Sequence, residues 1–141
     1  MTQQMNDFNL GIIEEFRAND GETSGMFKGR PLLLLTTKGA KSGEQRTTPL
    51  VYTRDGDRVV VIASMGGAPK HPAWFFNIRS NPEVTVELGN EKFKATASVP
   101  EGAERDRLYE QQAAMMPAFT EYQQKTTRRI PVVALKRIPQ G

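Results

Sequence analysis

The chain has 141 residues, of which 38% are hydrophobic and 25% charged, with 19 basic side chains against 16 acidic ones. This composition indicates one soluble globular domain, and the apolar runs, such as residues 32–35, are far shorter than the roughly 20 residues that cross a bilayer. The sequence has no cysteine and one histidine, which excludes disulfides, a thiolate nucleophile and metal centres built from cysteines or several histidines.

The basic charge is concentrated in the middle of the chain. Residues 1–27 carry one basic and five acidic side chains, whereas residues 28–79 carry nine basic and three acidic ones. A basic segment of this kind predicts an anionic ligand or partner. Because no secretory signal pattern opens the chain, we expect a cytoplasmic protein.

Residues 1–27 predict an amphipathic helix followed by a connector. Apolar residues recur at helical spacing at positions 5, 8, 12, 13 and 16, and Gly21 is expected to stop the helix. Such a helix could lie on a membrane surface or cover a substrate site. Its acidic polar face disfavours anionic lipid, so we favour the cover.

From residue 31 the pattern changes to short strands. We expect strands at residues 32–37, 47–53, 58–63, 83–88, 91–99 and 131–136, with hairpin turns at 55–56 and 89–90. Helices are expected at 72–81, 101–116 and 117–128. Antiparallel strands with long helices only near the ends favour a mainly β barrel over a doubly wound sheet. The chain is then one domain, 1–141, with the barrel over 31–137.

Residues 38–43, here called the basic turn, are the densest candidate site. Lys38, Lys41 and the nearby Arg46, with the Ser42 hydroxyl and glycine-exposed backbone N–H groups, could bind phosphate or carboxylates. The order of residues is not that of a Walker loop. The alternative is a solvated hairpin turn without a ligand.

Two further segments could line a ligand site. Residues 63–67 place Ser64 and two glycines at the end of a strand, where barrels commonly bind ligands. Residues 71–77 hold the only tryptophan, Trp74, which could form the wall of a flat-ring pocket or pack in the core. For Phe75 and Phe76 we expect core packing.

Four other side chains have open or modest roles in the sequence. His71 is expected to be a solvent-facing loop histidine, because it has no acidic neighbour in sequence. Arg128 and Arg129 are expected to be a solvated pair. The Tyr122 hydroxyl could point at a substrate, or the ring could cap the core. No catalytic triad or acidic metal cluster is visible, so an enzyme of this sequence would take its chemistry from a cofactor.

Taken together, these motifs resemble the deazaflavin (coenzyme F420)-dependent nitroreductase and quinone reductase family. The resemblance rests on residues 39–43 and 46–50, then on 63–67, 71–77 and 81–82, with the 55–58 hairpin between them. It covers about residues 31–137. It implies a split β-barrel of the FMN-binding-protein type that uses reduced F420 to transfer hydride to quinones, enones, unsaturated lactones or nitroaromatic compounds.

The resemblance also implies a set of cofactor-binding residues. Contacts with the phosphate and the oligoglutamate tail are implied for Ala40, Lys41, Ser42 and Arg46. The ring and its side chain would meet Thr47, Thr48, Pro49, Leu50 and Val51. Backbone contacts would come from Ile62, Ala63, Ser64 and Met65, and Ala73, Trp74, Phe75, Phe76 and Asn77 would complete the pocket.

Two catalytic positions follow from the same resemblance, Ser64 and Tyr122. Ser64 could donate a hydrogen bond to the carbonyl that becomes negative as hydride arrives. Met65 stands where members often have a basic residue. Phe119 and Lys125 stand where nitroimidazole-reducing members have aromatic side chains, which disfavours nitroreduction.

Two alternatives remain open at this point. One is a non-catalytic or FMN-dependent cofactor-binding protein on the same barrel. The other, ranked last, is a nucleic-acid-binding barrel, because the aromatic residues lie on expected helices and not among basic residues on adjacent strands. We therefore expect a small-molecule hydride acceptor, no nucleic acid, and a monomer or homodimer.

Overall fold

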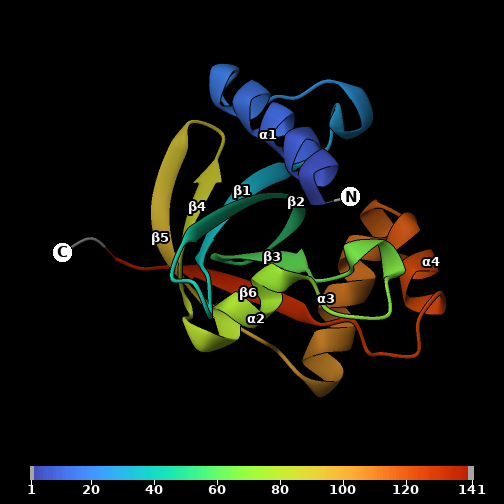
Figure 1. Cartoon of the computed structure of the whole chain (residues 1–141). Helices are drawn as coiled ribbons and strands as arrows, with labels where there is room; N and C mark the ends of the chain where they lie inside the picture. The colour runs from blue at the N-terminus through green and yellow to red at the C-terminus, as the bar shows by residue number, and fades with distance from the viewer. Residues whose placement is uncertain (1, 140–141) are drawn as a thin grey trace.

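The computed structural model describes residues 2–139, including their side chains except those of residues 2–8 and 26. In chain order the elements are α1 (Thr2–Ala18), η1 (Gly25–Phe27), β1 (Leu32–Lys38), β2 (Gln45–Asp55), β3 (Arg58–Ile62), η2 (Met65–Gly67), α2 (Ala73–Ser80), β4 (Glu83–Leu88), β5 (Glu91–Ser98), α3 (Gly102–Met115), α4 (Ala118–Gln124) and β6 (Val132–Arg137). Figure 1 shows them. Three expected boundaries were wrong by two residues or more: β2 begins two residues earlier and ends two residues later than expected, and α4 ends before residue 128.

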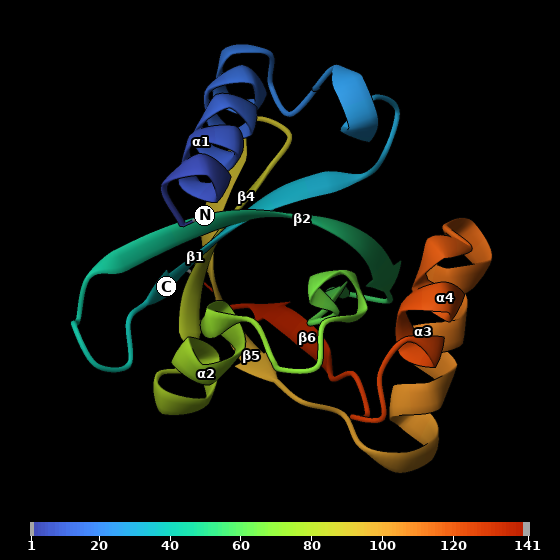
Figure 2. The same ribbon diagram turned by 45° about the vertical axis from the view of Figure 1, so that its right-hand side comes forward.

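The strands form a closed antiparallel barrel in the order β1-β2-β3-β6-β5-β4. Hairpins join β1 to β2, β2 to β3 and β4 to β5, while β6 returns from the last helix to pair with both β3 and β5. Figures 1 and 2 show α1 across one side of the barrel and α3 with α4 against another. The prediction of a mainly β barrel is confirmed.

The leucine run of the sequence lies in strand β1, where both faces of the strand are buried. Alternate residues of a strand point to opposite faces, and here both faces are covered. Leu33 and Leu35 join a core cluster that includes α2. Leu32 and Leu34 join a second cluster beneath α1, α3 and α4. All four side chains are at most 4% exposed, so each contributes roughly 2 kcal/mol of hydrophobic stabilisation.

Strand β2 is paired unequally on its two edges. It pairs with β1 over residues 45–51, but its pairing with β3 begins only at Tyr52. Within the described chain, residues 45–51 therefore have one edge without a strand partner. Pro49 lies in this half, where its missing N–H removes no hydrogen bond to β3. The unpaired edge leaves backbone groups available to a ligand.

Helix α1 packs on the barrel through its apolar face. Ile13 and Phe16 are buried in the cluster that also holds α3 and α4 residues. The Arg17 guanidinium donates two hydrogen bonds to the Glu87 carboxylate of β4, at 2.9 and 2.7 Å. These contacts fix α1 to the barrel, and its role as a cover of a substrate site stays a prediction. In residues 2–139, no helix combines the length and apolarity that crossing a membrane requires.

Candidate functional site

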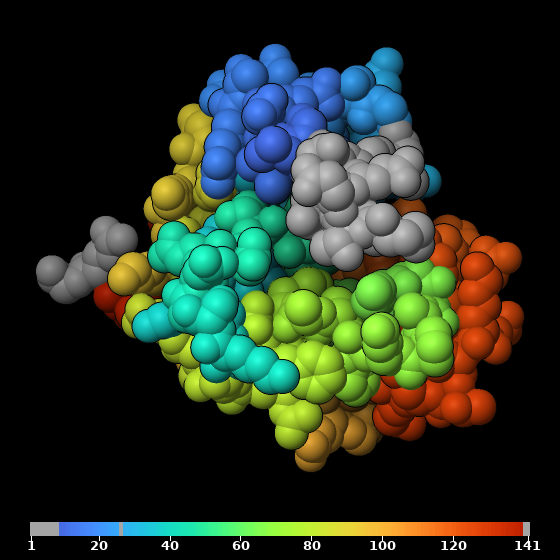
Figure 3. All heavy atoms as spheres, in the orientation of Figure 1, coloured from blue at the N-terminus to red at the C-terminus, as the bar shows by residue number. Residues whose placement is uncertain are grey.

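Four segments lie in a strip on one face of the molecule. They are the basic turn, helix α2, residues 64–68, called the Ser64 loop below, and α4. The space-filling view shows this strip beneath α1, with the basic turn at one end and α4 at the other (Figure 3). Most of the residues expected to bind a ligand from the sequence lie in this strip or on the β2 segment beside it.

The basic turn is closed by its own backbone and fixed to α2 by Asn77. The Gly39 N–H donates to the Glu44 carbonyl at 2.7 Å. Asn77 is 8% exposed; its Oδ1 accepts from the Ala40 N–H at 3.0 Å, and its Nδ2 donates to the Thr37 hydroxyl at 3.1 Å. The Asn77 amide and the Ala40 N–H are therefore already hydrogen-bonded within the protein. Contact of Ala40 and Asn77 with a ligand stays a prediction.

A hollow of about 360 Å³ lies at the basic turn, lined by Lys38, Gly39, Ala40, Lys41, Ser42, Gly43, Ser80 and Asn81. No ion pair among the described residues involves Lys38 or Lys41, so their positive charges are uncompensated there. Arg46 does not line the hollow; its exposed guanidinium pairs with Glu44 at 3.2 Å. The hollow suits an anionic group, with Lys38 and Lys41 as its cations.

The β2 segment expected to meet a ring presents few free side chains. The Thr47 hydroxyl is hydrogen-bonded to that of Thr36 at 2.8 Å. Pro49 and Val51 are buried, and Thr48 and Leu50 are half-buried. A ligand on this segment would therefore meet Thr48 and Leu50 together with the unpaired backbone edge.

Helix α2 exposes Ala73 and Phe76 and buries Trp74 and Phe75. Phe76 is 48% exposed, whereas Trp74 and Phe75 are 6% and 4% exposed. The expectation that Phe76 packs in the core was wrong. For Trp74, the structure shows the second of the two alternatives, packing in the core. The helical period is the reason, because burying Trp74, Phe75 and Ile78 turns Ala73 and Phe76 outward.

The Ser64 loop has a left-handed backbone. Met65, Gly66 and Gly67 have φ values of 48°, 66° and 84°, a region that side chains other than glycine rarely adopt. Ser64 is 8% exposed, and its hydroxyl does not cap the turn that follows. Ile62 and Ala63 are buried, so only their backbone could meet a ligand.

The Ser64 loop is pressed against α4. A Cβ atom added to Gly67 would lie 2.8 Å from the Tyr122 carbonyl oxygen, closer than a real Cβ contact. The Tyr122 ring is half-buried and packs edge-on against Phe119, with centroids 5.3 Å apart. The structure thus brings Tyr122 and the loop of Ser64 together.

Arg128 is not solvated, contrary to the expectation from sequence. Its guanidinium donates to the carbonyl oxygens of Ala63 at 3.3 Å, Ser64 at 2.8 Å and Ala68 at 2.8 Å. Its Nη1 also lies 3.0 Å from Nδ1 of His71. Burial lowers the pKa of Arg128. The guanidinium therefore joins the strand end, the loop and His71.

His71 is likewise half-buried and not a solvent-facing residue. Its ring packs against Phe75 at a centroid distance of 4.8 Å. Burial lowers its pKa, and the positive charges of Arg128 and Arg79 lower it further. Because arginine only donates hydrogen bonds, Nδ1 of His71 must accept, which leaves the neutral ring with its proton on Nε2.

Sequence reasoning missed the roles of Arg128 and Asn77. A weak signal for Arg128 existed: after Glu121 the sequence contains five basic residues and no acidic one, so an arginine there lacks a local counterion. No comparable signal marks Asn77. Its partners Thr37 and Ala40 lie about forty residues earlier in the sequence.

Comparison with known proteins gives a consistent result. The chain matches the family model described as F420H(2)-dependent quinone reductase over residues 12–137. It is similar to an F420H(2)-dependent quinone reductase of Mycobacterium tuberculosis, with 39% identity over 126 residues that cover 86% of this chain and 85% of that protein.

Two solved structures are also similar. An F420-H2 dependent reductase, FDR-A, is 42% identical, with a TM-score of 0.70 over 76% of this chain and 95% of that chain. A structure described as a domain-swapped dimer is 36% identical, with a TM-score of 0.72 over 96% of this chain and all of that chain (100%). Both similarities extend over the barrel and agree with the split-barrel fold implied by the motifs.

Proposed function

Because this chain belongs to the F420H(2)-dependent quinone reductase family, we propose that it uses reduced coenzyme F420 to transfer a hydride to a quinone. Enones and unsaturated lactones are further acceptors in this proposal, and nitroaromatic compounds are the least favoured. The observation that carries it is the strip that joins an anion-binding hollow at the basic turn to the Ser64 loop and Tyr122.

The residues present fit a cofactor with an anionic tail and a flat ring. Lys38 and Lys41 line the hollow without a counterion in the described chain, so phosphate or carboxylate groups there would gain their attraction. The unpaired edge of β2 offers backbone donors and acceptors. The exposed Phe76 of α2 offers an aromatic surface. An FMN-dependent or non-catalytic protein on the same barrel is the alternative, because FMN also has a phosphate and a flat ring.

When bound, the reduced deazaflavin supplies the hydride, so the protein has to position the reactants and need not activate them. In this proposal Ser64 acts on the acceptor. Its hydroxyl is not used to cap the turn, and it could donate a hydrogen bond to the oxygen on which negative charge develops. Tyr122, packed beside the loop, helps to hold the acceptor.

We further propose that the protein is cytoplasmic, acts on a small molecule and binds no nucleic acid. It is proposed to exist as a monomer or homodimer. The relative described as a domain-swapped dimer supports the homodimer. Light scattering coupled to gel filtration would distinguish a mass near the 15.7 kDa of one chain from twice that mass.

A fluorescence titration with oxidised F420 and, in parallel, with FMN tests the proposal. We expect saturable binding of F420 at micromolar concentration and much weaker binding of FMN. Oxidation of reduced F420 should then depend on added menadione, a naphthoquinone. Preference for FMN would support the flavin alternative, and F420 binding without menadione-dependent oxidation would support the non-catalytic one.

A further inference from the structure

One guanidinium, that of Arg128, spans both ends of the Ser64 loop. It donates to the carbonyls of Ala63 and Ser64 where the loop begins and to that of Ala68 where it ends. Its contact with His71 ties the segment that follows to the same group. Four contacts from one side chain therefore connect β3, the loop and the approach to α2.

The charge of Arg128 has no acidic partner among the described residues. No ion pair there includes it, although the side chain is half-buried. Carbonyl oxygens and the neutral imidazole of His71 are its partners instead. A half-buried guanidinium is stabilised in this way only while these acceptors stay in place, so the positions of the arginine and the loop depend on each other.

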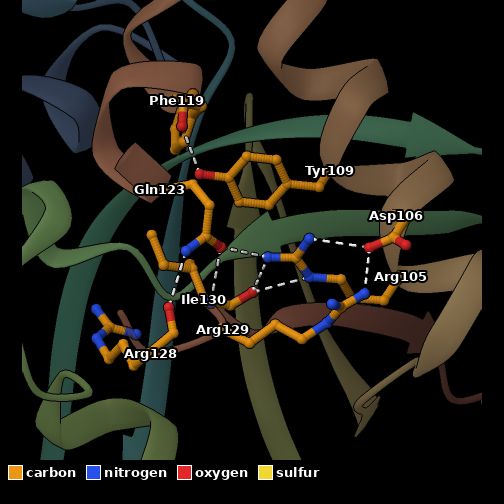
Figure 4. A network of polar contacts seen from close by, with 8 residues as sticks. All are labelled: Arg105, Asp106, Tyr109, Phe119, Gln123, Arg128, Arg129 and Ile130. Atoms are coloured by element: carbon orange, nitrogen blue, oxygen red, sulfur yellow. Dashed lines mark hydrogen bonds and ion pairs between the residues drawn. The ribbon is translucent and has the colours of Figure 1, made fainter. Parts of the chain in front are cut away.

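The backbone of Arg128 is itself held in place by the helices. Figure 4 shows Gln123 of α4 donating through Nε2 to the Arg128 carbonyl, at 2.8 Å. The Gln123 Oε1 accepts from Arg105 of α3 at 2.7 Å and from the Ile130 N–H at 3.0 Å. Arg105 is 8% exposed. The guanidinium of Arg128 therefore projects from a rigid base.

The Ser64 loop needs such an anchor. Three successive residues, Met65 to Gly67, are in the left-handed region, which is strained at Met65 because this residue has a side chain. Such a conformation persists only where surrounding contacts determine it. Close packing on Tyr122 is one of these contacts. The Gly67 and Ala68 N–H groups donate within the loop, to the carbonyls of Ser64 and Met65, and Arg128 supplies the contacts that join the two ends of the loop.

We propose that Arg128 is a positioning residue, which holds the Ser64 loop in its left-handed conformation and thereby places the Ser64 hydroxyl for hydride transfer. Its effect on turnover rests on the function proposed above, whereas its effect on the loop does not. Lysine cannot replace it, because one ammonium group cannot reach carbonyls at both ends of the loop and the imidazole as well.

The single histidine of the chain is a built-in reporter of this contact. The imidazole nitrogen and carbon-bound proton signals of His71 can be followed by NMR in the wild type, Arg128→Met and the control Arg129→Met. Arg129 is the exposed neighbour that pairs with Asp106. We expect one Nε2–H tautomer in the wild type and in Arg129→Met. In Arg128→Met we expect a mixture of tautomers and faster amide exchange across residues 64–68.

The second readout is steady-state kinetics with reduced F420 and menadione. We expect Arg128→Met to lower kcat at least tenfold while the dissociation constant of F420 changes less than threefold, because the hollow at the basic turn is separate from the loop. Arg129→Met should stay within twofold of the wild type. For Arg128→Lys we expect kcat to fall at least threefold. The amide protons of the Ser64 loop should exchange at rates between those of the wild type and those of Arg128→Met.

Unchanged His71 signals and loop exchange in Arg128→Met would overturn the proposal, and so would unchanged kcat in a variant whose loop has loosened. Should Arg128→Met fail to fold, Arg128→Lys decides: wild-type exchange and kcat in that variant would overturn the proposal. A wild type that neither binds F420 nor reduces menadione would instead refute the proposed function, and the NMR comparison would still test whether Arg128 holds the loop.

Discussion

The basic turn and the Ser64 loop are both short, glycine-containing connections on one face of the barrel, but they are built in opposite ways. In the basic turn the lysines extend into solvent around a hollow, and the backbone bonds are local or go to Asn77. In the Ser64 loop the charge comes from outside the loop, from Arg128, and is directed at the loop's own carbonyls.

The difference indicates two separate roles: the lysines of the basic turn attract an anion, whereas Arg128 positions the backbone of the Ser64 loop. Exposed lysines attract an anion over a distance and are screened by salt. A half-buried guanidinium bonded to carbonyls exerts little force on distant charges but fixes the backbone to which it is bonded. We therefore expect changes in the basic turn to alter cofactor affinity, and changes in the loop to alter turnover or stability.

The largest effect is expected for Gly67→Ala. The new Cβ would combine a positive φ of 84° with backbone atoms of Tyr122 at 2.8 and 3.1 Å, so we expect a loss of about 2–4 kcal/mol in the free energy of unfolding. Gly66→Ala is the matched control: its φ is 66° but nothing lies within 4 Å, so about 1 kcal/mol is expected. Urea unfolding measures both, and equal losses would show that packing on α4 does not constrain the loop.

Next in size is Ser64→Ala. The hydroxyl does not cap the turn, so the variant should fold with nearly unchanged stability. If Ser64 stabilises the developing charge on the acceptor, kcat should fall on the order of 10–100-fold, with F420 affinity within twofold. Rapid-mixing kinetics with saturating reduced F420 provide the measurement. A variant with wild-type kcat would remove Ser64 from the mechanism.

A smaller effect is expected in the basic turn. Lys41→Ala should weaken F420 binding about threefold to tenfold at low ionic strength and less at 0.5 M salt, because the lost attraction is between exposed charges. Arg46→Ala is the comparison, since Arg46 pairs with Glu44 and lies outside the hollow. We expect it to have the smaller effect. A loss that is the same at both salt concentrations would argue against attraction of an anionic tail.

The smallest effect concerns pH and His71. Burial, Arg128 and Arg79 lower the pKa of His71 in the folded protein below its ordinary value of 6.5. As pH falls below about 6.5, the unfolded chain takes up the proton first, so the contribution of His71 to stability, complete above that pH, declines toward its folded pKa.

Thermal unfolding of the wild type and His71→Gln between pH 5 and 7.5 tests this effect. The wild type should lose stability toward pH 5 more steeply than His71→Gln, which has no imidazole to titrate. The lowered pKa values of Asp55, Glu87 and Asp106 act at lower pH, because the ordinary pKa values of these carboxyl groups are near 4. Parallel profiles in the two proteins would show that His71 is not kept neutral by its surroundings.

Much of the fold could be predicted because its signals are local. The β2–β3 hairpin, whose turn lies at 56–57 and thus one residue later than expected, and the β4–β5 hairpin each depend on residues within one hairpin. The alternation in β5 and the amphipathic pattern of α1 depend on residues within one element. The basic turn was also visible, because a cluster of charges in a turn stays exposed. The boundary errors in β2 and α4 lie at element ends, where neighbouring strands and helices decide how far an element extends.

The sequence alone therefore determined the barrel's strands, the location of the positive charge and, through its ordered motifs, the family. Only the tertiary structure decided which aromatic residue of α2 faces outward, that Asn77 anchors the basic turn, and that Arg128 holds the Ser64 loop. The reason is physical: burial and hydrogen-bond partners depend on contacts between residues some forty to sixty-five positions apart. Such contacts exist only once the barrel has closed and the last helices have packed against it.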